Sequence, residues 1–357
     1  MRWLPDACGW SPAGWDRPLS FVVALVLGQA LALLVTATGA TSQSLTTFYG
    51  VSVPTTQSLL VYLLLISYAI PLARSGGLMP VLSSPKRLGG YLLVAIADVE
   101  ANFLVVKAYN YTSLTSVMLL DCFTIPVVMA LAAMFLGTRF GRLHVSGVAA
   151  CLAGIVALVL ADYSSKSARE ADSAADMLYG DLLVLGGATL YAVSNVAQEF
   201  VVKSGDDARI EFLGMLGLLG APVSGLQVAL LESSELMRLE WRYEVVLLIG
   251  GFSMALFTFY SLAPVLVRAT SATFLNLSLL TADVYGLVVA IFLFAFSPSV
   301  MFVFSFFAII FGIVVYNYHP PKDALQLPSP VTPAATPAAS PAASPRGSVV
   351  LSASLPV

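Results

Sequence analysis

Acidic side chains stand inside long apolar stretches of this chain. Asp98, Glu100, Asp121 and Asp283 lie well within such stretches, and Glu199 lies near the end of one. Ionisable groups surrounded by hydrocarbon are costly, so they are rare and usually belong to a binding site or a transport pathway. A carboxylate there can bind a cationic or hydrogen-bonding group, or carry a proton. We therefore treat Asp98, Asp121 and Asp283 as candidate solute-binding residues.

Amides and tyrosines recur near these acids at helical spacing. Asp98, Asn102 and Tyr109 share one face of a helix, because 3.6 residues complete a turn. Tyr191, Asn195 and Gln198 form a second stripe. We expect one central cavity, and its predicted solute-binding residues are Asp98, Asn102, Tyr109, Asp121, Tyr191, Asn195, Tyr260, Asn276, Asp283 and Tyr285. For any single tyrosine the alternative is ordinary packing. For the asparagines it is an interhelical hydrogen bond of about 1 kcal/mol.

The sign of the charge in these stretches restricts the solute. Five acids stand against one base, Lys107. We expect Lys107 to form an ion pair with Glu100 near the membrane edge. A diphosphate group would need Lys or Arg donors, which this set lacks. A neutral or cationic solute, or proton coupling through a buried carboxyl, fits the acid excess better.

Several other chemistries find little support. The three cysteines (Cys8, Cys122 and Cys151) contain no C-x-x-C, and the two histidines have no H-E-x-x-H context, so we predict no metal and no cofactor. Net charge is −3 without a basic block, which argues against nucleic acid. An intramembrane aspartyl protease using Asp121 and Asp283 would need Gly-x-Gly-Asp around one acid, which is absent. We predict that the chain is not an enzyme.

The elements that position these residues follow from composition. Of 357 residues, 58% are hydrophobic and 10% charged, against about 25% charged in soluble domains. A spanning helix needs roughly 20 apolar residues, and the apolar runs do not alternate as barrel strands would. The sequence predicts an all-α membrane protein with ten transmembrane helices: 20–40, 54–73, 89–108, 113–136, 143–162, 179–202, 210–231, 243–266, 270–294 and 299–318. Pro126 and Pro222 are expected to interrupt their helices.

Short strings repeat along the chain in a constant order. Residues 25–30 (LVLGQA) match 183–188 (LVLGGA), and 154–156 (GIV) match 312–314, both at a spacing of 158. Leu120-Asp121 matches Leu275-Asn276 at a spacing of 155. Five helices per copy invert the second copy in the membrane, so we predict two inverted five-helix repeats around a site at mid-membrane.

Charge and composition complete the predicted organisation. Twelve of the 17 Lys and Arg residues fall on the side of the N-terminus, which places both termini in the cytosol. The predicted parts are a cytosolic leader at 1–19, a first repeat at 20–162, a non-cytosolic acidic linker at 163–178, a second repeat at 179–318, and a disordered Pro/Ala/Ser-rich cytosolic tail at 319–357.

Four strings of this sequence resemble those of a known family. They are residues 99–109 (VEANFLVVKAY), 119–123 (LLDCF) with Pro126, 180–191 (GDLLVLGGATLY) leading to 194–196 (SNV), and 271–283 with its NLSLLTAD. Together they resemble the F subfamily of solute carrier family 35, in the drug/metabolite transporter superfamily, over about residues 20–318. Residues 197–199 depart from the family pattern, which is more acidic there. The resemblance implies ten helices in two inverted repeats with cytosolic termini.

The resemblance also implies a substrate class. The wider family is named for nucleotide-sugar exchange, whereas close relatives in this subfamily are associated with uptake of queuine, queuosine and some cationic drugs. Our leading hypothesis is an EamA-like secondary transporter that moves a small polar solute, such as a nucleobase or nucleoside, by alternating access. A nucleotide-sugar or nucleotide antiporter of the endomembrane system is the alternative, and a receptor or scaffold without flux stays open. The expected partners are the lipid bilayer and a small-molecule solute. The membrane (plasma membrane or Golgi/endomembrane) and the oligomeric state are left open.

Overall fold

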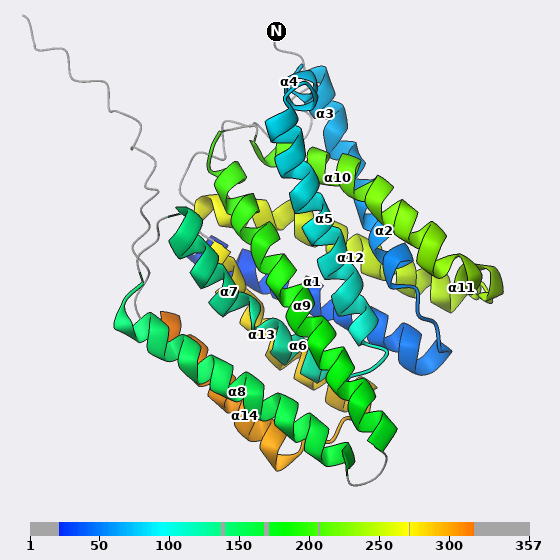
Figure 1. Ribbon diagram of the computed structural model, residues 1–357, viewed down its shortest axis with the longest axis vertical. Helices are drawn as coiled ribbons and strands as arrows, with labels where there is room; N and C mark the ends of the chain where they lie inside the picture. The colour runs from blue at the N-terminus through cyan, green and yellow to red at the C-terminus, as the bar shows by residue number, and fades with distance from the viewer. Residues whose placement is uncertain (1–20, 137–139, 168–170, 206–207, 271, 318–357) are drawn as a thin grey trace, which may run out of the picture. The chain divides into compact units, whose positions relative to one another are not determined.

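The computed structural model describes residues 21–136, 140–167, 171–205, 208–270 and 272–317, in which every regular element is a helix and no strand occurs. The predicted leader at 1–19 and tail at 319–357 lie outside the described residues. In chain order the elements are α1 (Phe21–Tyr49), α2 (Pro54–Leu65), η2 (Ile66–Tyr68), α3 (Ala69–Arg74), α4 (Leu78–Leu82), α5 (Pro85–Ala108), α6 (Leu114–Asp121), α7 (Thr124–Leu131), η3 (Ala132–Leu136), α8 (Arg142–Ser167), α9 (Ala171–Val202), α10 (Ala208–Gln227), η4 (Val228–Glu232), α11 (Ser233–Arg238), α12 (Tyr243–Ala269), α13 (Ala272–Leu293) and α14 (Val300–Asn317) (Figure 1).

Eight helical stretches among the described residues are long and apolar enough to cross a membrane. They are Val22–Tyr49, Pro54–Arg74, Pro85–Ala108, Leu114–Phe135, Ala175–Val202, Ala208–Arg238, Tyr243–Ala269 and Phe274–Leu293. At the places of the two remaining predicted helices stand shorter apolar stretches, Arg142–Ala157 and Val300–Gly312. The prediction of an all-α membrane protein is confirmed.

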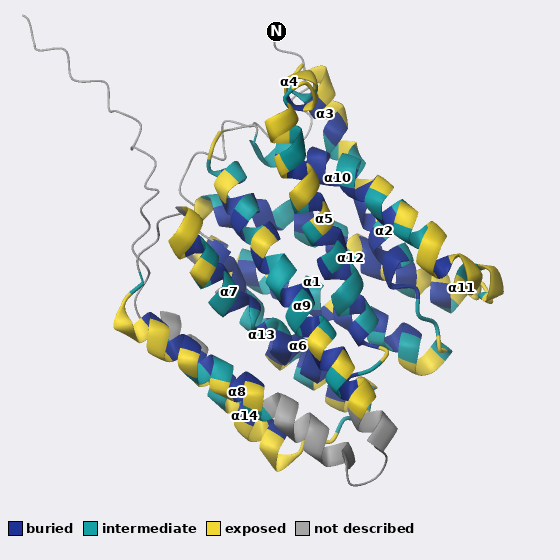
Figure 2. Ribbon diagram, viewed as in Figure 1, coloured by how far each residue is buried: buried dark blue, intermediate teal, exposed yellow. Residues whose placement is uncertain are grey.

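Apolar side chains cover much of the outside of the helices, and polar ones are buried between them. Leu93 is 71% exposed, Phe292 85% and Val300 90%, whereas Asp98 is 2% and Asn102 1% exposed. Figure 2 shows exposed residues along the outward faces of α8 and α10 and buried residues where the helices meet. A soluble protein has the opposite preference, so this distribution suits a lipid environment.

The fourth predicted helix is broken where polar residues gather. α6 ends at Asp121, and α7 begins only at Thr124. The cause is Pro126, which has no N–H and whose ring clashes with the carbonyl of the residue four positions earlier, Cys122. That carbonyl instead accepts a 3.0 Å bond from the Ile125 N–H. Pro222 has a different outcome: α10 runs unbroken from Ala208 to Gln227, so the interruption predicted there is wrong.

Long-range packing joins the helices in defined pairs. α5 packs along α9 and α1 along α12, while α2 packs on α10 and α8 on α14. α13 packs on α1, and both α6 and α7 pack on α9. Figure 1 shows α8 (green) and α14 (orange) running side by side. Two of these interfaces need glycine, because a Cβ on Gly217 would lie 2.5 Å from the Ile66 backbone nitrogen, and one on Gly312 would lie 2.5 Å from that of Cys151.

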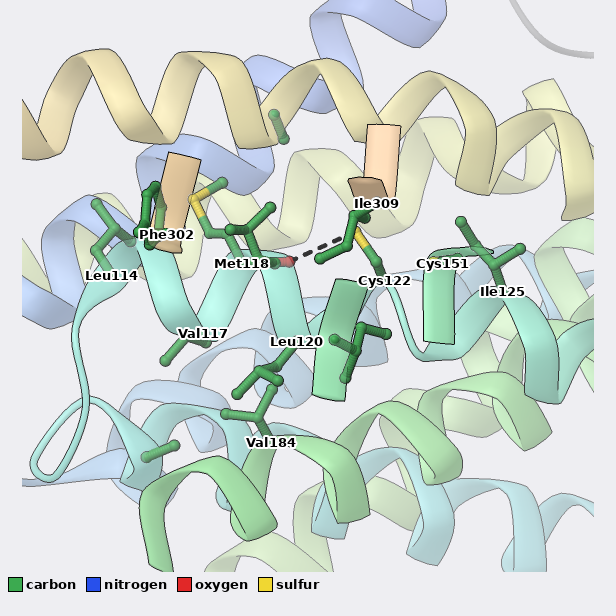
Figure 3. Packing of buried hydrophobic residues seen from close by; sticks show 14 of the residues in the cluster. Leu114, Val117, Met118, Leu120, Cys122, Ile125, Cys151, Val184, Phe302 and Ile309 are labelled. Carbon is green, nitrogen blue, oxygen red and sulfur yellow. Dashed lines mark hydrogen bonds between the residues drawn. The ribbon is translucent and has the colours of Figure 1, made fainter. Parts of the chain in front are cut away.

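A buried apolar cluster surrounds the broken helix. Met118, Cys122 and Ile125 of the α6–α7 segment share it with Cys151 of α8 and Ile309 of α14 (Figure 3). This packing holds the segment that carries Asp121 against the α8–α14 pair.

Candidate functional site: a central acidic cavity

A cavity lies between six of the long helical stretches. Its empty volume is about 1180 Å³, part of which is open solvent. Its walls come from α1, α5, the α6–α7 segment, α9, α12 and α13. The polar lining residues are Thr38, Asp98, Asn102, Tyr109, Asp121, Cys122, Thr124, Tyr191, Ser194, Asn195, Gln198, Tyr260, Asn276 and Asp283.

Asp98 is the centre of a hydrogen-bond network that engages both of its carboxylate oxygens. One carboxylate oxygen accepts a 2.8 Å bond from the Ser194 hydroxyl on α9. The other accepts bonds from the hydroxyls of Tyr260 on α12, at 2.5 Å, and Tyr62 on α2, at 2.9 Å. A carboxylate bonded to three hydroxyls is stabilised despite being buried. This network joins four helices through one side chain, since Asp98 itself is on α5.

Asn102 extends the Asp98 network by one helical turn. Its amide nitrogen lies 3.0 Å from the hydroxyl oxygens of both Tyr62 and Tyr260. Its amide oxygen accepts a 2.9 Å bond from the Tyr191 hydroxyl of α9. The predicted stripe of Asp98 and Asn102 is thus linked to the predicted stripe on α9.

The other two cavity carboxylates have far fewer partners among the described residues. Asp121, the last residue of α6, is half-buried and accepts one long bond, 3.5 Å, from the Thr124 hydroxyl. Asp283 on α13 is 6% exposed and accepts a 3.2 Å bond from the Cys122 thiol. Their remaining hydrogen-bonding capacity faces the cavity that they line.

Amide groups with free capacity line the same cavity. Gln198 is 6% exposed, and its side-chain nitrogen is buried without a hydrogen-bond partner. Asn276 donates a 2.8 Å bond to the Ala272 carbonyl one turn earlier on α13. An unpaired buried N–H group costs about 1–3 kcal/mol, so the Gln198 nitrogen indicates a place for a hydrogen-bond acceptor.

No Lys, Arg or His is among the described residues that line the cavity. Two basic groups outside the cavity are paired with acids: Lys203 lies 2.5 Å from Glu199, and Arg87 lies 2.5 Å from Glu211. Glu199 also accepts a 3.1 Å bond from the Ala272 N–H at the start of α13, so it ties α9 to α13. Among the described residues, no group of His, Cys, Asp and Glu is arranged to hold a metal ion.

Nine of the ten predicted site residues line this one cavity. Tyr285 does not: its hydroxyl donates a 2.8 Å bond to the Gln29 side chain of α1. The prediction that the ten bind a solute stays a prediction. Sequence reasoning missed Tyr62 and Ser194, which complete the Asp98 network. The spacing could have found Ser194, because it lies three residues after Tyr191 and four before Gln198, on the same helical face.

The expected ion pair between Glu100 and Lys107 is wrong. Glu100 accepts a 2.5 Å bond from the Gln227 amide of α10, and the Lys107 ammonium lies 5.1 Å from the centre of the Phe103 ring. Seven residues span about 10 Å along a helix, which is too far for direct contact. The Lys107 charge is instead close to a ring four residues away, as in a cation–π contact.

These features define a multi-pass helical membrane protein with a polar cavity among its helices. Residues 18–318 match the SLC35F description of solute carrier family 35. Solute carrier family 35 member F2 of Mus musculus is 42% identical over 321 residues, covering 89% of this chain and 84% of that protein. Its Xenopus tropicalis namesake is 41% identical over 299 residues, covering 83% and 76%. The chain belongs to solute carrier family 35.

More distant relatives extend the comparison. An uncharacterized member of solute carrier family 35 from Schizosaccharomyces pombe is 35% identical over 300 residues, covering 83% of this chain and 58% of that protein. A solved crystal structure superposes with a TM-score of 0.56 at 19% identity, covering 84% of this chain and 98% of its own, and supports the fold alone. Family membership makes this a multi-pass solute transporter and points away from an enzyme.

Proposed function

We propose that this protein is a secondary carrier that moves a small polar, neutral or cationic solute through the central cavity by alternating access. The observation that carries the proposal is the charge of the cavity: Asp98, Asp121 and Asp283 line it, with no basic side chain among its described lining residues. Nucleobases and nucleosides such as queuine and queuosine offer N–H donors and ring acceptors that match carboxylates and amides. Tyr109, Tyr191 and Tyr260 offer aromatic surfaces for a planar ring.

We also propose ten membrane-spanning helices in two inverted five-helix repeats. The pairing of helices supports this arrangement, because exchanging each helix with its repeat mate turns the α5–α9 pair into the α12–α1 pair. The α8–α14 interface supports it residue by residue. A Cβ on Gly154 would meet Ile309, and a Cβ on Gly312 would meet Cys151. Gly154 and Gly312 are 158 residues apart, and so are Cys151 and Ile309. The two contacts are therefore the same contact seen from each repeat.

The alternative is a nucleotide-sugar or nucleotide antiporter. Such a solute carries phosphates, which proteins hold with Arg and Lys or with helix N-termini. The acidic lining of the cavity disfavours it. For orientation, the excess of Lys and Arg on the side of the N-terminus supports cytosolic termini in the plasma membrane or an endomembrane.

Uptake into liposomes tests the proposal. Liposomes bearing the full chain are offered labelled nucleobases, nucleosides and nucleotide sugars. We expect saturable uptake of an uncharged or cationic base or nucleoside, and loss of that uptake in Asp121→Asn. The matched control is Glu240→Gln, which neutralises a carboxylate whose side chain is 76% exposed and lies outside the cavity. Saturable uptake of nucleotide sugars alone would reverse the ranking of the two candidates.

A further inference from the structure

The three cavity carboxylates differ in how far the protein already satisfies them. Asp98 accepts hydrogen bonds from three hydroxyls on three other helices, and it is 2% exposed. Asp121 has a single bond of 3.5 Å, and Asp283 has a single bond from a thiol, which is a weak donor. A buried charge without good partners is costly. The structure therefore leaves Asp121 and Asp283, but not Asp98, in need of a donor from outside the chain.

The place where Asp121 stands also favours positive charge. Asp121 is the last residue of α6 at the break before α7. The C-terminal end of a helix carries partial negative charge, and broken membrane helices bind cations in this way. Cys122 follows Asp121 in the chain and its thiol donates to Asp283, so Asp283 of α13 lies at the same break. Tyr109 and Tyr191 stand nearby in the cavity wall, with faces that attract cations.

A second unsatisfied group gives the cavity a different requirement. The side-chain nitrogen of Gln198 is buried, unpartnered and a donor, so it needs an acceptor. Gln198 lies seven residues beyond Tyr191 on α9, about 10 Å along the helix. A solute that satisfies these groups would carry N–H donors at the α6–α7 break and a carbonyl or ring-nitrogen acceptor further along α9. Among the described residues no metal-holding group exists, which favours an organic cation over a metal ion at the acids.

We propose that Asp121 and Asp283 form the subsite that binds the positively charged, N–H-bearing group of the solute, that Gln198 binds an acceptor on the same solute, and that Asp98 is a positioning residue that never contacts it. This inference rests on the proposed function for the identity of the site, but it concerns binding and not flux. The inference assigns different roles to Asp98 and Asp121. Removing Asp98 weakens the assembly of α2, α5, α9 and α12, whereas removing Asp121 weakens recognition of charge.

Thermal unfolding of the full-length protein in detergent tests this division. The probes are benzamidinium, a planar cation with four N–H donors, and benzamide, a neutral molecule of nearly the same shape. At ~10 mM probe, a site with a Kd of ~1 mM is about nine-tenths filled and stabilises the folded state. We expect benzamidinium to raise the Tm of the unmodified protein in a concentration-dependent manner, and benzamide to raise it much less.

The variants separate recognition from positioning. Asp121→Asn should keep the basal Tm and lose the shift with benzamidinium. Asp98→Asn should lower the basal Tm and keep the shift, and Ser194→Ala, which removes one donor to Asp98, gives the same test in a milder form if Asp98→Asn does not fold. The assignment is overturned if both probes shift the Tm equally or if neither shifts it. It is also overturned if benzamidinium shifts the Tm of Asp121→Asn fully, or if folded Ser194→Ala loses the shift. A benzamidinium shift in a protein that transports nothing would instead refute the proposed function and leave the subsite intact.

Discussion

The α8–α14 interface makes the sharpest structural prediction. A Cβ on Gly312 would lie 2.5 Å from the Cys151 nitrogen and 2.6 Å from the Gly147 carbonyl oxygen, both backbone atoms that cannot move as a side chain can. Ordinary contact begins at 3.4 Å. Gly312→Ala must therefore push the two helices apart by about 0.9 Å or strain them, in an interior packed as densely as a crystal.

The expected cost of Gly312→Ala follows from two opposing effects. Overpacking of this kind destabilises by about 1–3 kcal/mol. Replacing a helical glycine by alanine returns about 0.5–1 kcal/mol through backbone entropy. We expect a net loss of about 1–2 kcal/mol, which lowers the apparent Tm of the detergent-purified protein by about 2–4 °C. The matched control is Gly250→Ala in α12, where nothing lies within 4 Å of the new Cβ, and this variant should be neutral or slightly more stable.

Gly154→Ala extends this prediction to the repeat. Its Cβ would lie 2.9 Å from the Ile309 nitrogen, a milder clash than that at Gly312. We expect Gly154→Ala to lower the stability too, by less than Gly312→Ala does. If Gly312→Ala is as stable as Gly250→Ala, the close approach of α8 and α14 is refuted. If Gly154→Ala alone is neutral, the two sides of the interface are not equivalent and the reciprocal packing behind the inverted repeats loses its support.

Two further predictions concern the start of α2 and the residue that follows α5. Glu232 of η4 accepts bonds from the Thr55 and Thr56 N–H groups at the start of α2, at 2.5 and 2.8 Å. Glu232→Ala should therefore lower the free energy of unfolding in detergent by about 2–4 kcal/mol. The control Glu240→Ala, at an exposed site, should leave it unchanged. Tyr109 lines both the central cavity and a neighbouring one that contains Asn110 and Ser297. Tyr109→Ala should therefore speed modification of Cys122 by a membrane-impermeant thiol reagent at least several-fold, whereas Tyr109→Phe keeps the ring and should leave the rate unchanged; equal rates in both variants would contradict a barrier at this ring.

Sequence reasoning found the helices because length and apolarity alone define a membrane span. The ends of the helices were harder to predict from the sequence. α9 begins at Ala171, eight residues before the predicted start, because its first turns are polar and carry no apolar signal. The break before α7 agrees with the simple expectation that each proline interrupts its helix, whereas the continuity of α10 at Pro222 differs from it. The proline ring removes one backbone bond in both cases, and neighbouring helices decide whether the helix tolerates it.

The site was predictable where one helix carries the pattern and obscure where two helices must cross. Asp98 and Asn102 share a face by spacing alone. Tyr62 joins them only because α2 crosses α5, and nothing around Tyr62 in the sequence records that crossing. Tyr285 could have been excluded, because it lies two residues after Asp283 and is therefore turned by about 200° around α13. It contacts α1 instead.

The unequal satisfaction of the carboxylates bears on how a carrier can couple binding to movement. A ligand shifts a conformational equilibrium only through different interactions with the two states. A solute bound to the Asp98 network would compete with hydroxyls that already bond to both carboxylate oxygens, so less free energy would remain to favour one state. Asp121 stands at the break between α6 and α7, where the Cys122 and Phe123 N–H groups bond to carbonyls three residues earlier, at 3.3 and 2.9 Å. A donor bound there gains a full charge-assisted bond where the α-helical bonding pattern changes. We therefore expect the geometry of this break, and not that of the Asp98 network, to differ between solute-bound and solute-free states.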